Sequence, residues 1–143
     1  MFQSAGGIVG DGIALYNYFR TLPIELHLYN AGSVASIAVL AYLGAGHRWV
    51  SPQATFSMQK STLLPGAPVS AAQHRAFAEY LAIEDRRAEA IVKAHTQIPA
   101  ERWQALIGGT HDIVFAAEEA VAFGIAEAVR DFAVPAGQQL FSV

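Results

Sequence analysis

The feature that most constrains the fold is a long apolar run, residues 30–47, which reads NAGSVASIAVLAYLGAGH. Its serines, Ser33 and Ser36, lie near its start, and a glycine cluster at residues 6–12, GGIVGDG, precedes it in the chain. Small residues around a serine at the start of an apolar helix are typical of a nucleophile that a substrate backbone must approach closely. A buried core helix whose serines hydrogen-bond to their own backbone explains the run as well. The run alone therefore does not establish a nucleophile.

The composition indicates one domain that is more apolar than a monomer of its size needs for its core. The chain has 143 residues, of which 53% are hydrophobic and 15% charged, and its mean hydropathy is +0.30. A monomer of this size cannot bury so much apolar surface, so the excess predicts a subunit interface. The net charge of −3 and the lack of a basic cluster argue against nucleic acid as a partner.

Metal and cofactor motifs are missing from the sequence. The chain contains no cysteine, which excludes disulfides and thiolate metal sites. Its histidines are spread along the chain without the spacing of a metal-binding motif, which argues against zinc. They are His27, His47, His74, His95 and His111. We therefore expect no metal and no cofactor.

The sequence also argues against membrane association. Residues 31–46 are apolar, but they are short for a bilayer and interrupted by glycines and serines. The first residues, MFQSAGG, have neither the charged start nor the long apolar core of a signal peptide. We expect a cytoplasmic protein.

Strand and helix signals alternate in the first half of the chain. Residues 2–4 are typical of a strand end, and a turn over residues 6–12 leads into a helix that Pro23 ends. The elements that follow are expected to be a strand at 24–29, a helix from about 34 to 44–46, and strands at 48–51 and 55–59. This order predicts an α/β domain.

A long helix dominates the second half. Ser70 and Gln73 form a capping box at the start of a helix expected over 70–96. Its charged residues, among them Glu84 and Asp85, are assigned to a solvated or inter-subunit face. Because such a helix is long for a small domain, we expect it to project and to pack against another subunit. The remaining elements are expected to be a helix at 99–107, a strand at 113–115, a helix at 118–123 and a strand at 125–132.

Three motifs in this order resemble those of the proteolytic subunit of the Clp protease, a serine peptidase with the crotonase-type fold. Residues 4–7, SAGG, are similar to the family's SPGG, and residues 32–36, GSVAS, are similar to GQAAS. Residues 119–125, EAVAFGI, are similar to EAVEYGLV. Three motifs in the right order are far more specific than any one of them, and they favour the nucleophile over the plain core helix.

The resemblance implies an overall architecture and a set of partners. A single α/β domain at 1–132 would be a superhelix of repeated ββα units, followed by a C-terminal tail at 133–143. The helix at 70–96 would be a projecting handle in a homo-oligomeric ring, and the substrates would be peptides or unfolded proteins. In the family an additional N-terminal segment meets a Clp ATPase. This sequence begins beyond that docking segment, so an ATPase partner is left open.

The resemblance also assigns roles by position. Ser36 would be the nucleophile at the start of its helix, where the helix dipole favours developing negative charge. The backbone N–H groups of Gly7 and Ile37 would form the oxyanion hole. Asp112 falls at the position of the acid that orients the base, although an aspartate that caps a turn would look the same.

The base of the triad is missing. The family's histidine lies in a motif of the type MIHQP, and the corresponding residues 57–61 read SMQKS, with Gln59 in place of histidine. An amide does not titrate near neutral pH, so Gln59 cannot take the proton of the serine. Two substitute bases stay open, namely His111, beside Asp112 in sequence, and Lys60, if its strand is shifted by one residue.

Three functions are compatible with these residues. The first is a Clp-type serine endopeptidase, or a weak remnant of one, and the second is a non-catalytic ring subunit or scaffold. Gln59 favours the second for this chain acting alone. A crotonase-like acyl-CoA enzyme would share the oxyanion hole, but no glutamate lies near either glycine turn to serve as its base.

Overall fold

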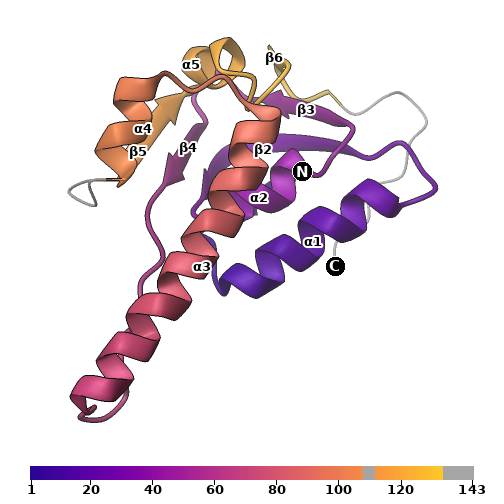
Figure 1. Ribbon diagram of the computed structural model, residues 1–143. Helices are drawn as coiled ribbons and strands as arrows, with labels where there is room; N and C mark the ends of the chain where they lie inside the picture. Colours follow the sequence, from indigo (N-terminus) through magenta and orange to yellow (C-terminus); the bar gives the residue numbers. More distant parts are fainter. Residues whose placement is uncertain (108–111, 134–143) are drawn as a thin grey trace.

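The computed structural model describes residues 1–107 and 112–133, which form a single mixed α/β domain (Figure 1). Within these residues one six-stranded sheet has the strand order β5-β4-β2-β3-β6, with β1 paired to β2. The elements are β1 (Phe2–Ser4), α1 (Val9–Thr21), β2 (His27–Ala35), α2 (Ala38–Leu43), β3 (His47–Val50), β4 (Thr55–Met58), α3 (Ala71–His95), α4 (Ala100–Ile107), β5 (Ile113–Ala116), α5 (Ala117–Ala122) and β6 (Ala128–Val129).

Strand β2 organises the sheet, because three other strands pair with it. Strands β1, β3 and β4 all run parallel to β2, and β5 runs antiparallel to β4. The carboxyl ends of β1, β2 and β4 therefore meet the amino end of β5 at one edge of the sheet. In open α/β sheets, ligands bind beyond the carboxyl ends of the strands.

The boundary between strand and helix in the apolar run, residues 30–47, differs from the sequence prediction. Residues 30–35, expected to be loop and the start of a helix, are the second half of β2. Small residues such as these carry no strong period-2 signal, so only pairing with β1 and β4 reveals the strand. The helix is reduced to α2, and all of its residues are buried, as expected for a core element.

Two further boundaries also differ. Helix α1 begins at Val9, inside the glycine cluster that was expected to be a turn. The strand expected at 125–132 is shortened to β6, Ala128–Val129. It begins later than predicted because Ile125 and Ala126 both donate their backbone N–H to the carbonyl of Ala120 in a turn. The other elements agree with the prediction to within three residues, including α3 with its capping box.

Helix α3 differs from the prediction in the roles of its acidic residues. Its first half extends beyond the sheet, whereas its second half packs against the body of the domain (Figure 1). Glu84 is buried and bonds to Arg87 at 2.7 Å. Asp85 is half-buried and accepts the backbone N–H of Ser61 at 2.8 Å. Both were assigned to a solvated or inter-subunit face. For Asp85, the sequence does not show that the loop after β4 packs against this helix.

A partly buried hydrogen-bond chain joins the end of α3 to α1. Arg20 donates to the hydroxyl of Tyr16 at 2.6 Å, which leaves the Tyr16 proton for Nε2 of His95 at 2.8 Å. A neutral His95 can accept this proton at Nε2. Burial, together with the charges of Arg48 and Arg20, lowers the pKa of His95 below its usual 6.5.

This chain predicts a pH dependence of stability. Because the pKa of His95 is lower in the folded than in the unfolded state, the unfolded state binds the extra proton more readily. Protonation of His95 should therefore lower the free energy of unfolding, measured by urea denaturation, as the pH drops from about 7.5 to about 5.5, whereas His47, whose pKa is raised by Glu127 and Glu25, acts in the opposite direction. His95→Gln removes the first contribution and should show a smaller fall than the wild type, whereas exposed His74→Gln should behave like the wild type. An equal fall in His95→Gln would contradict this assignment.

Candidate active site

Ser36 occupies a strained turn between β2 and α2. Its φ of +55° is the only positive value at a non-glycine residue within the described residues. Such a conformation is costly for a residue with a side chain and is common at functional sites. Its backbone N–H donates to the carbonyl of Ser57 at 2.8 Å, which ties the turn to the end of β4. The fold thus fixes the position of this serine.

The loop after β1 packs directly against the serine. Gly6 has a φ of +98°, and a Cβ at this position would lie 2.6 Å from Cβ of Ser36 and 3.0 Å from the carbonyl oxygen of Ala35. A Cβ at Gly7 would meet no atom within 4 Å. Gly6 therefore allows the close approach of the loop to Ser36, whereas Gly7 faces open space.

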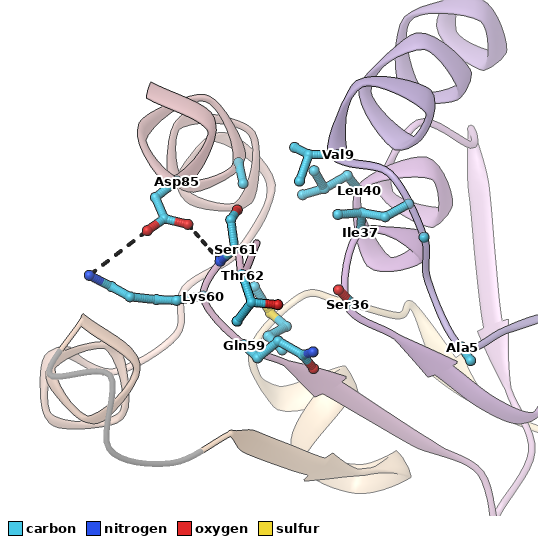
Figure 2. A pocket seen from close by; sticks show the side chains of 13 residues that line it. Ala5, Val9, Ser36, Ile37, Leu40, Gln59, Lys60, Ser61, Thr62 and Asp85 are labelled. Carbon is cyan, nitrogen blue, oxygen red and sulfur yellow. Dashed lines mark hydrogen bonds and ion pairs between the residues drawn. The ribbon is translucent and has the colours of Figure 1, made fainter. Parts of the chain in front are cut away.

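A cleft of about 200 Å³ lies over this turn (Figure 2). Ser36, Gly7, Ile37 and Gln59 all line it. Within the described residues, the backbone N–H groups of Gly7 and Ile37 donate to no protein acceptor. Two unpaired N–H groups beside a serine hydroxyl are the donors that an oxyanion requires.

The sheet topology explains why these residues meet. Gly7 follows β1, Ser36 follows β2 and Gln59 follows β4, and these three strands are parallel with their carboxyl ends at one edge. Apolar side chains of α1, α2, β4 and α3 close the cleft around them, namely Val9, Leu40, Met58 and Ala88. Segments far apart in sequence therefore form one cleft.

Comparison with known families agrees with this geometry. The family model for Clp protease matches residues 1–132. The chain belongs to the Clp protease family. The resemblance inferred from the three motifs is thereby confirmed. No helix in the part of the chain that the structure describes is long and apolar enough to cross a membrane.

The positions that the motif resemblance assigns to a catalytic triad are only partly brought together. Gln59 lines the cleft with Ser36, but Asp112 is exposed and does not line it. Asp112 lies at the same edge, since the residue after it, Ile113, pairs with Met58, the residue before Gln59. Among the described residues, no hydrogen bond joins Asp112 to Gln59 or to Ser36.

One of the two substitute bases, Lys60, belongs to the lining of the cleft, but its ammonium group pairs with α3 rather than with the serine. Lys60 extends toward α3, where its Nζ lies 3.9 Å from a carboxylate oxygen of Asp85 (Figure 2). The strand shift that would turn Lys60 inward is not seen, because β4 pairs with β2 from Thr55 to Ser57 in a continuous register. His111 lies outside the described residues.

Sequence reasoning missed the part that α3 plays in this cleft. Asp85 lines the cleft and anchors both Lys60 and the backbone of Ser61, so it fixes the course of the chain just after Gln59. No motif signals this contact, since Asp85 is one member of a run of charged residues on a long helix. No glutamate lines the cleft within the described residues, so the glutamate base considered for a crotonase-type reaction is not found there.

Proposed function

We propose that this chain is a Clp-type ring subunit that binds extended peptides and hydrolyses them slowly or not at all on its own. The observation that carries the proposal is that Gln59 lines the cleft beside Ser36. The motif resemblance assigns this position to the family's histidine. A neutral amide can hydrogen-bond to the serine but cannot take up its proton. The oxyanion donors and the cleft alone would leave only a small residual rate.

Peptide binding is supported by the features that remain in the cleft. Unpaired N–H groups of Gly7 and Ile37 can hydrogen-bond to a peptide carbonyl, and the apolar wall can accept a side chain. These contacts use backbone and apolar surface, so they do not depend on a base. Loss of catalysis therefore does not imply loss of binding.

A second candidate is an active serine endopeptidase with a different base. The strained turn at Ser36 favours it, because a φ of +55° is costly and would be of little use in a scaffold. Such an enzyme would need His111 or a reoriented Lys60 as base, and Asp85 would then have to release Lys60.

Self-association is supported by exposed apolar side chains on the projecting part of the molecule. Tyr80 and Ile83 on α3 are each 47% exposed, and Leu64 in the loop before α3 is 95% exposed. Apolar side chains clustered on an extended helix are typical of a subunit contact.

The same purified chain tests self-association and the loss of hydrolysis with retained peptide binding. We expect light scattering of the purified chain at micromolar concentration to show an oligomer, and Tyr80→Glu with Ile83→Glu to reduce its mass. We expect wild type and Ser36→Ala to hydrolyse a fluorogenic peptide at equally low rates, while a labelled peptide still binds. A monomer would contradict the ring subunit, and a wild-type rate well above that of Ser36→Ala would favour the endopeptidase.

A further inference from the structure

A second cluster of chemically active side chains lies at the opposite end of the sheet from Ser36. His27 begins β2 and His47 begins β3, and the two residues are register partners on adjacent parallel strands. Their ring centroids are 4.6 Å apart, and Glu25 lies just before β2. Because β2 spans nine residues, this cluster is about 30 Å from the serine cleft.

The donor atoms of this cluster converge on one point. One oxygen of Glu25 lies 2.7 Å from Nε2 of His47, and its other oxygen lies 3.6 Å from Nε2 of His27. The ligand atoms of all three side chains lie within 4.8 Å of one another. In a tetrahedral zinc site, ligand atoms about 2.0–2.1 Å from the metal are about 3.3 Å apart. Small rotations of these exposed side chains would reach that geometry.

A fourth residue holds one histidine in the orientation that a metal ligand needs. Nδ1 of His47 lies 3.0 Å from a carboxylate oxygen of Glu127 and donates to it. Nε2 lies 2.7 Å from Glu25 and donates to that carboxylate in the metal-free protein, so it is the nitrogen that a metal ion would take over. The backbone N–H of Glu127 donates to the carbonyl of Arg48 at 2.7 Å, which fixes Glu127 beside β3. Metal-ligating histidines characteristically donate their second N–H to a carboxylate in this way.

We propose that Glu25, His27 and His47 form a binding site for a single divalent transition-metal ion of the zinc type, with Glu127 as the positioning residue. Two imidazoles and one carboxylate are a common zinc ligand set, and water would take the fourth position. Metal binding would release the proton on Nε2 of His47, and the two carboxylates, with a combined charge of −2, would then balance the charge of a divalent ion. The site is independent of the serine chemistry.

Zinc titration by calorimetry, on protein without a histidine tag, tests the proposal. We expect the wild type to bind one zinc ion per chain, and His27→Gln or His47→Gln to weaken binding by more than about tenfold. Glu127→Gln should weaken it by roughly tenfold, the usual effect of losing such a carboxylate. His74→Gln, which removes an exposed histidine outside the cluster, should bind zinc like the wild type. Circular dichroism checks that each variant is folded.

A second readout uses Trp49, whose ring centroid is 5.0 Å from that of His27. Copper bound at the cluster should quench Trp49 fluorescence in the wild type and in His74→Gln, but not in Glu25→Gln combined with His27→Gln. The proposal is overturned if zinc binds no more tightly to the wild type than to the His27 and His47 variants, or if quenching persists in the double variant.

Discussion

Replacing Gln59 with histidine should raise hydrolysis of peptides or activated esters by at least about a hundredfold, because a positioned general base typically contributes 10²–10⁴-fold. The substitution restores a group that titrates near neutral pH in the cleft that already holds Ser36 and the N–H groups of Gly7 and Ile37. Asp112 lies at the same sheet edge, because Ile113 pairs with Met58. The measurement is kcat/KM for a fluorogenic peptide.

Two controls separate base restoration from other effects. Gln59→Asn keeps an amide at this position and should give no gain. Gln59→His combined with Ser36→Ala should lose the gain entirely, because the nucleophile is gone. If Gln59→His is folded and oligomeric but gives no gain, then the site is disabled by more than the missing base.

Gly12→Ala should destabilise the fold by about 1–3 kcal/mol, the usual cost of overpacking a tightly packed contact. Gly12 is buried in α1, and a Cβ there would lie 2.6 Å from Cδ1 and 2.8 Å from the carbonyl oxygen of Ile37. The backbone oxygen cannot move without shifting the turn that holds Ser36. We expect a lower urea midpoint with an unchanged m-value, and a weaker gain from Gln59→His in this background.

Gly10→Ala is the matched control, because it makes the same change in the same helix. A Cβ at Gly10 would meet no atom within 4 Å. Alanine is the better helix former, so Gly10→Ala should be neutral or stabilising by up to about 1 kcal/mol. Equal destabilisation by both substitutions would contradict the packing argument, since it would point to the glycine cluster as a whole.

Local signals in the sequence predicted those parts of the fold that depend on local chemistry. The capping box of Ser70 and Gln73 identified the start of α3, because both hydrogen bonds are made within one helical turn. The second half of β2 was missed because pairing with β1 and β4, not its own periodicity, makes it a strand. Asp85 was misassigned for a similar reason, since Ser61, whose backbone N–H it accepts, is distant in sequence.

In the candidate site, too, the sequence identified the residues but not the contacts between distant segments. Motif resemblance identified Ser36, Gly7, Ile37 and Gln59, and the structure brings these four to one cleft. The sequence could not show that Gly6, rather than Gly7, contacts the serine, because that depends on a positive φ and on the position of β1 beside β2.

The histidines illustrate the limit of spacing arguments. His27 and His47 are twenty positions apart and match no metal motif, yet parallel strands bring them into register. A search for ligand spacing along one element cannot detect a pair formed across two strands.

Labelling of Ser36 by a fluorophosphonate probe, read by intact mass, tests the central claim most directly. The claim is that the chain keeps the nucleophile and oxyanion donors of a Clp-type site but lacks a base to activate the serine. We expect no labelling of the wild type or of Ser36→Ala, and labelling of Gln59→His at one site per chain. Labelling of the wild type at Ser36 would contradict the claim, because it would show a serine that is activated in spite of Gln59.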